Sequence, residues 1–85
     1  MKLLETSKFS KLRKKIRDEA ESAALKSAIQ IILKDPQAGK KLKGEFEHLR
    51  SFSFEARGQA RRLIYHWEKD TIVLFSFGPR QGIYK

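Results

Sequence analysis

The chain has 85 residues, enough for one domain with a single modest core but not for two. It contains no cysteine, which excludes disulfides and cysteine-ligated metal sites and fits a reducing compartment such as the cytoplasm. Its 19 lysines and arginines against 10 acidic residues leave a net charge of +9. Such a protein attracts polyanions, first nucleic acid and then an acidic protein partner, although basic residues can also serve solubility alone.

The N-terminal half has the pattern of a short strand and two helices. Lys2–Thr6 suits an edge strand, and Thr6 or Ser7 can cap the helix that follows. Apolar residues recur at helical spacing as far as Lys34, but on one continuous helix the two apolar stripes would lie about 180° apart. We therefore expect a break near Asp18–Ser22 between two antiparallel helices.

The C-terminal half has the pattern of a sheet. Pro36 ends the second helix, because the residue before a proline disfavours helical geometry, and Pro36–Gly44 is a basic connector with glycines for turns. Alternating and apolar runs then predict three strands. These are His48–Glu55, Arg61–Trp67 and Thr71–Phe77, with turns at Arg57–Gln59 and Glu68–Asp70.

This order predicts an α+β fold in a single domain spanning residues 1–85, with an N-terminal helical pair packed on one face of a small, mostly antiparallel β-sheet. Thr71–Phe77 is nearly all apolar, as in a central strand covered on both faces. In Arg61–Trp67, alternation puts Leu63, Tyr65 and Trp67 on one face. The open face of the sheet would be polar and positively biased, carrying Ser51, Ser53, Glu55, Arg62 and His66.

Several motifs are absent or weak. Gly39–Gly44 lacks the lysine and hydroxyl residue that a phosphate-binding loop needs after its second glycine. The histidines, His48 and His66, have no spacing typical of a metal site, and we expect half-buried strand histidines. The basic run Lys11–Arg17 suits a solvated helix face, with phosphate contact as the alternative. No apolar stretch approaches the length of a membrane span.

An ordered series of motifs resembles the RelE/ParE toxin superfamily, and more specifically its RelE-type mRNA endonucleases. The series covers nearly the whole chain and consists of Pro36, Gly39, Leu42–Gly44, Leu49–Arg50, Arg62–Tyr65, Gly78–Arg80 and Tyr84. The resemblance implies a cytoplasmic toxin without metal or cofactor that cuts mRNA in the ribosomal A site. A ribose 2′-hydroxyl would attack the adjacent phosphate and give a cyclic phosphate. A co-encoded antitoxin would silence the toxin.

The resemblance also implies site residues. Arg62 and Arg80 match arginines that stabilise phosphate charge, and Tyr84 matches a tyrosine that stacks on or orients a nucleotide. Where some RelE proteins carry two lysines, this strand has Ser51–Glu55, so the resemblance leaves the identity of the general base open. Glu55 is the nearest chemical substitute for the base, and the alternative is that Glu55 is an ordinary surface carboxylate at the end of the strand. The residues implied to bind messenger or ribosomal RNA are Lys41, Lys43, Arg50, Arg61 and Ser53.

Two other functions stay open. A ParE-like toxin would bind DNA gyrase and do no chemistry, and a degenerate relative would retain only RNA or antitoxin binding. The pair Arg80 and Tyr84 favours the nuclease, because a gyrase inhibitor has no evident need of it. The missing lysine pair keeps the degenerate relative in consideration.

Overall fold

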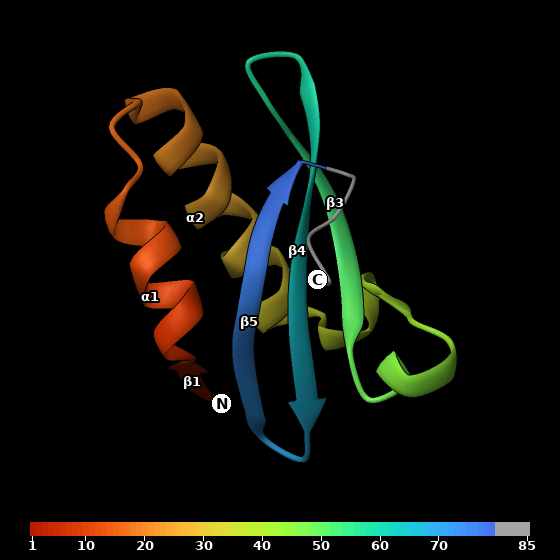
Figure 1. Cartoon of the computed structure of the whole chain (residues 1–85). Helices are drawn as coiled ribbons and strands as arrows, with labels where there is room; N and C mark the ends of the chain where they lie inside the picture. Colours follow the sequence, from red (N-terminus) through yellow and green to blue (C-terminus); the bar gives the residue numbers. More distant parts are fainter. Residues whose placement is uncertain (80–85) are drawn as a thin grey trace.

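A computed structural model describes residues 1–79, and within them two helices cover one face of a five-stranded sheet with strand order β1-β5-β4-β3-β2 (Figure 1). Strands β1 and β5 pair in parallel and the other pairs are antiparallel, so the predicted α+β fold is confirmed. The elements are β1 (Lys2–Glu5), α1 (Ser7–Lys14), α2 (Glu19–Lys34), the 3₁₀ turn η1 (Pro36–Ala38), β2 (Lys40–Lys41), η2 (Gly44–Phe46), β3 (Arg50–Ala56), β4 (Gln59–Glu68) and β5 (Thr71–Pro79).

Both helices begin at capping side chains. The Thr6 hydroxyl accepts from the Phe9 N–H, which confirms the predicted cap of α1. The Asp18 carboxylate accepts from the Ala20 N–H at the start of α2, so the break lies at residues 15–18, earlier than the predicted Asp18–Ser22. The carboxylate also pairs with Arg57 in the β3–β4 turn, and Arg57 lowers the pKa of Asp18. No helix within residues 1–79 has the length and apolar character of a membrane span.

The main core lies between the helices and the sheet. Leu63 and Tyr65 of β4 are fully buried against the helices and Trp67 packs at the margin, as alternation along the strand predicts. Phe9 of α1 meets Phe77 of β5 edge to face, with ring centroids 5.1 Å apart. The buried members of this core are Phe9, Leu25, Ala28, Ile32, Leu63, Tyr65, Ile72, Leu74 and Phe77.

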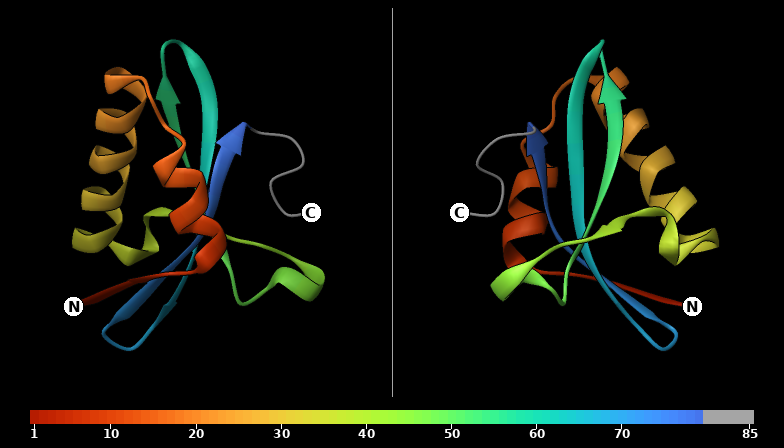
Figure 2. Two further views of the ribbon diagram at one scale, coloured as in Figure 1. Left: turned by 60° about the vertical axis from the view of Figure 1, so that its left-hand side comes forward. Right: turned by 90° about the vertical axis from the view of Figure 1, so that its right-hand side faces the viewer.

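The open face differs from the predicted polar surface. Leu49 and Ile64 are buried there, and Leu42, Phe46 and Phe75 pack around them. The cluster forms because residues 42–49 lie across the sheet on the side opposite α2, as both views of Figure 2 show. Strand β5 is therefore covered by helices on one face and only in part by this segment on the other.

Some predicted boundaries also shift. Strand β3 begins at Arg50 rather than His48, because His48 lies in the preceding loop, where its carbonyl contacts the His66 ring. The turn between β3 and β4 has only Arg57 and Gly58 between the paired residues, both with positive φ, and Gln59 already pairs with Ala56. The basic connector contains an unpredicted edge strand, β2, which pairs with the first two residues of β3.

A buried tyrosine holds the connector on the sheet. The Tyr65 hydroxyl donates to the Pro36 carbonyl at 2.6 Å and accepts from the Gly39 N–H at 2.9 Å. A Cβ at Gly39 would lie 2.6 Å from the Tyr65 hydroxyl oxygen, so only glycine permits this approach. The Arg50 guanidinium adds a 2.9 Å hydrogen bond to the Gly39 carbonyl. The connector therefore leaves α2 in one defined direction.

We predict that Tyr65→Phe destabilises the fold by about 1–3 kcal/mol, because it leaves a buried N–H and a carbonyl without a partner. Thermal unfolding followed by circular dichroism should show a melting temperature lower by roughly 4–8 °C per kcal/mol. Gly39→Ala should also destabilise, since its methyl group meets the same hydroxyl. A Tyr65→Phe protein that melts within about 1 °C of wild type would contradict this account.

The same variant has a predicted pH dependence. Burial raises the pKa of the Tyr65 hydroxyl above its ordinary value of 10.0. The unfolded chain therefore ionises at lower pH than the folded one, and the wild-type free energy of unfolding falls as the pH rises past 10.0. Phenylalanine does not ionise, so the free energy of unfolding of Tyr65→Phe lacks this pH dependence. The difference in free energy of unfolding between wild type and Tyr65→Phe should therefore narrow in alkaline solution.

Candidate functional site

A basic hollow lies on the open face where the connector meets β3 and β4. Its volume is about 420 Å³. The residues that line it are Ala38, Lys40, Lys41, Leu42, Lys43, Ser51, Phe52, Ser53 and Arg62. Four residues that the sequence predicted as site residues, Lys41, Lys43, Ser53 and Arg62, thus meet in one place. Their side chains supply positive charge and hydrogen-bond donors, which suit a phosphate.

The register of the sheet brings the polar residues of this hollow together. Ser53 of β3 lies directly opposite Arg62 of β4, and Lys40 of β2 lies opposite Ser51. Ser51 is only 8% exposed, and its hydroxyl oxygen has no hydrogen-bond partner among the described residues. Ser51 is the residue that the sequence prediction of RNA contacts missed, although alternation had placed it on the open face. A buried hydroxyl without a partner beside cationic side chains is suited to an anionic ligand.

Glu55 lies on the same face, further toward the β3–β4 turn. It is exposed and pairs with Ala60, one step of two residues beyond the Ser53–Arg62 pair. Glu55 and Arg62 are therefore diagonal neighbours across the strands, a separation that long side chains can span. The structure thus places a carboxylate beside the basic hollow, at its margin.

Two of the residues predicted to contact RNA, Arg50 and Arg61, lie on the helical face of the sheet. The Arg61 guanidinium is 3.3 Å from the Glu21 carboxylate of α2, and its side chain is 17% exposed. Arg50 hydrogen-bonds the Gly39 carbonyl, and its guanidinium carbon lies 5.4 Å from the centre of the Trp67 ring. The structure therefore does not bring Arg50 and Arg61 to the basic hollow. Arg80 and Tyr84 lie outside the described residues.

The histidines lie on the open face near the end of β4. The His66 Nδ1 is 2.6 Å from the His48 carbonyl oxygen, so this nitrogen carries the proton and donates it. His48 is exposed in the loop before β3, rather than half-buried in a strand as predicted. Within residues 1–79, no three histidine, aspartate or glutamate side chains gather into a metal-binding group.

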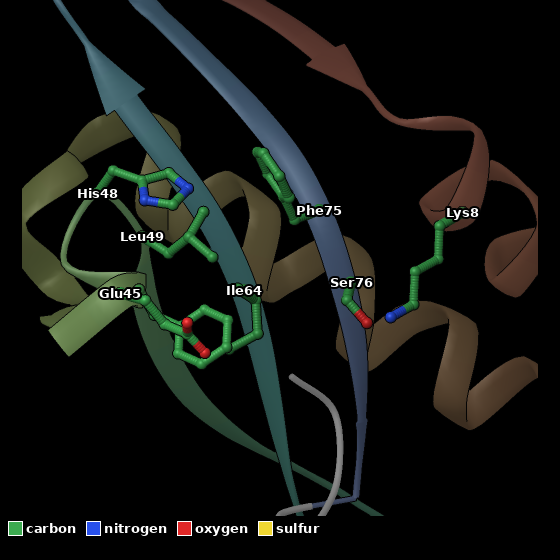
Figure 3. A pocket seen from close by; sticks show the side chains of 8 residues that line it. Lys8, Glu45, His48, Leu49, Ile64, Phe75 and Ser76 are labelled. Carbon is green, nitrogen blue, oxygen red and sulfur yellow. The ribbon is translucent and has the colours of Figure 1, made fainter. Parts of the chain in front are cut away.

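A second concavity, the apolar hollow, adjoins the basic hollow on the same face. It is lined chiefly by Phe46, His48, Leu49, Ile64 and Phe75, and Figure 3 shows that Lys8 and Glu45 lie at opposite margins. The sequence did not predict this hollow, because its walls come from a connector and two strands. The apolar residues at positions 42, 46 and 49, within an otherwise charged segment, were the available signal.

The family of the chain is shown by its sequence. The family model described as the ParE-like toxin of type II bacterial toxin–antitoxin systems matches residues 3–85. The chain belongs to this family. It is therefore a toxin of the RelE/ParE superfamily, as the motif series predicted. No curated protein shows significant sequence similarity to it.

Solved structures support the fold. The chain is similar to one from the crystal structure of the intact Escherichia coli RelBE toxin–antitoxin complex, with a TM-score of 0.73 and 17% identity over 95% of this chain and 98% of that one. It is also similar to the conserved hypothetical protein HP0894 from Helicobacter pylori, with a TM-score of 0.58 and 21% identity over 94% of each chain. At these identities the similarity shows the fold alone.

We predict that the basic hollow carries the electrostatic part of RNA binding. Each phosphate contact to a single strand contributes about 0.7 to the slope of log affinity against log salt. Arg62→Gln should therefore reduce this slope by about 0.7, and the double variant Lys41→Gln, Lys43→Gln by about 1.4, in fluorescence anisotropy with a labelled oligoribonucleotide.

Arg61→Gln is the matched comparison for Arg62→Gln, because the two arginines are adjacent on β4 and point to opposite faces. Since Arg61 contacts α2, its replacement should leave the slope unchanged once thermal melting shows that the variant is folded. An Arg61→Gln slope that falls as far as that of Arg62→Gln would show that RNA does not bind at the basic hollow.

Proposed function

We propose that this toxin is a ribosome-dependent endoribonuclease that cleaves mRNA in the A site and so stops translation. The observation that carries the proposal is the meeting of Ser53 and Arg62 with the connector lysines in one hollow on the open face. Cleavage of RNA through its own 2′-hydroxyl needs cations around the phosphate more than it needs a cofactor. An open, cationic sheet face supports this chemistry.

In this proposal each residue has a defined role. Arg62 stabilises the negative charge of the pentacoordinate phosphate, and Arg80 does the same from the C-terminal motif. Glu55 takes the proton of the 2′-hydroxyl as that oxygen bonds to phosphorus. The bond from phosphorus to the 5′-oxygen then breaks, that oxygen takes up a proton from water, and a cyclic phosphate remains. Tyr84 orients the nucleotide.

The proposal also names the partners. The chain would bind mRNA held by the ribosome, with Lys41 and Lys43 in contact with messenger or ribosomal phosphates. A cognate antitoxin would silence it, by analogy with the RelBE complex, in which a toxin of similar fold is bound by its antitoxin. The net charge of +9 suits an acidic protein partner as well as RNA.

A gyrase inhibitor is the second candidate, because the family that matches the sequence is described as ParE-like. Such a toxin would need a protein-binding surface but no phosphate site. A buried Ser51 hydroxyl beside Arg62 and the lysines has no role in that function, which is why the nuclease is preferred. A degenerate relative that only binds RNA or antitoxin would keep the basic hollow and lack cleavage.

We predict that inducing the chain in bacteria arrests growth and produces new mRNA 5′ ends in phase with the reading frame. Arg62→Gln or Arg80→Gln should lower the cleavage rate by about 10²–10³-fold, the usual effect of losing one group that stabilises transition-state charge. Sequencing of 5′ ends after induction measures both effects. Arg17→Gln, an exposed arginine on the helical side, is the control and should cleave normally.

The alternatives give different outcomes in the same experiment. Growth arrest with a DNA-damage response and intact messages would identify a gyrase inhibitor. Full toxicity of both the Arg62 and the Arg80 variants would refute this assignment of the site. An induced chain that neither arrests growth nor cuts messages, yet binds RNA, would be the degenerate relative.

A further inference from the structure

The apolar hollow is a second site on the open face that the proposed chemistry leaves unused. Its volume is about 440 Å³. Leu49 and Ile64 form a floor that is nearly inaccessible to solvent, with exposures of 6% and 2%, and the ring of Phe75 stands beside them (Figure 3). The ring of His48 meets that of Phe75 edge to face, with centroids 6.3 Å apart and planes at 73°. The hollow thus has an apolar floor and aromatic walls.

A strand bulge and two hydrogen bonds to backbone carbonyls fix the walls of the apolar hollow. Ile64 pairs with Ser76, but the next residue of β4, Tyr65, pairs with Leu74, so Phe75 is an extra residue in β5. In such a bulge two successive side chains can face the same side, and both Phe75 and Ser76 line the hollow. The Thr6 hydroxyl donates to the Phe75 carbonyl at 3.1 Å. The His66 ring fixes the His48 carbonyl in the same way.

The apolar hollow directly adjoins the basic one. Ser51, which lines the basic hollow, lies opposite Ile64, which lines the apolar hollow. Arg62 and Ile64 are two residues apart on the same face of β4, a distance of about 6.6–6.8 Å along a strand. A nucleotide that places its phosphate at Arg62 would therefore bring its own base, or the neighbouring one, to the apolar hollow.

We propose that the apolar hollow binds one unstacked base of the RNA next to the phosphate held by Arg62, and that Glu45 selects among bases. The inference rests on the proposed function, because it takes single-stranded RNA as the ligand. Proteins that read single-stranded RNA hold unstacked bases against aromatic side chains. A protein with a net charge of +9 attracts RNA.

The carboxylate at the margin gives the site its selectivity. An ionised Glu45 only accepts hydrogen bonds. It should favour adenine, cytosine and guanine, which carry an amino group on the edge used for pairing, over uracil, whose only donor on that edge lies between two carbonyl oxygens. Lys8 at the opposite margin suits a flanking phosphate of the same strand.

The test is a titration of the protein, labelled with ¹³C at leucine and isoleucine methyl groups, with the four nucleoside 5′-monophosphates. We expect saturable shifts of the Leu49 and Ile64 methyl signals, with UMP binding weakest. Phe75→Leu keeps an apolar side chain but removes the ring face, and should weaken binding about 10-fold, within the range known for base stacking. Phe54→Leu, a half-buried ring on the helical face, is the matched control and should bind as wild type does.

Selectivity is tested with Glu45→Gln. Glutamine donates hydrogen bonds as well as accepting them, so this variant should no longer discriminate against UMP. Glu47→Gln, an exposed neighbour that does not line the hollow, should retain it. Nucleotides that leave the Leu49 and Ile64 signals unmoved would overturn the proposal. So would an antitoxin segment that shifts those signals where nucleotides do not, since the hollow would then be a docking site for protein.

The test of the base site and the test of the nuclease can succeed or fail independently of each other. Methyl shifts with nucleotides in a chain that cuts no mRNA would retain the base site and refute the nuclease. In-frame cleavage, with neither methyl shifts nor a Glu45→Gln effect on the bases flanking the cuts, would retain the nuclease and refute the base site.

Discussion

The close approach of the Tyr65 hydroxyl to Gly39 is the constraint on which the open face depends. Tyr65 belongs to the core between sheet and helices, yet its hydroxyl reaches the connector and binds both Pro36 and Gly39. The chain therefore turns from the end of α2 through η1 into β2. Because β2 is then paired with β3, Lys40 and Lys41 lie at the edge of the open face rather than on a free loop. A polar atom in the core thus positions the charges of the surface.

The bulge in β5 has a comparable effect at the other end of the site. An extra residue in a strand leaves a carbonyl outside the regular ladder, and the Thr6 hydroxyl binds that of Phe75 while it caps α1. The start of the helical pair is thereby tied to the strand that shapes the apolar hollow. Both hollows are consequently formed by strands and connector segments that local anchors hold in position, which suits a site that must be in place before its ligand arrives.

The sequence predicted those features that depend on local patterns. Alternation along β4 placed Leu63 and Tyr65 in the core and Arg62 outside it, and Thr6 was recognised as a cap. The same alternation requires Arg61 to face α2, so its assignment as an RNA contact came from the resemblance alone. Strand β2 and the apolar cluster were missed, because they depend on contacts between residues far apart in the chain, and no local period records such contacts.

Strand β3 lacks the two lysines that some RelE proteins carry, and this separates two roles that lysine can combine. Attraction of RNA needs only charge within reach, and the connector lysines at the sheet edge supply it beside the basic hollow. Proton transfer instead needs a group at the reacting oxygen. Serines at positions 51 and 53 leave room and hydrogen-bonding capacity next to Arg62, so under the proposed function the proton acceptor must come from further along the strand. Glu55 is the titratable side chain that follows on that face of β3.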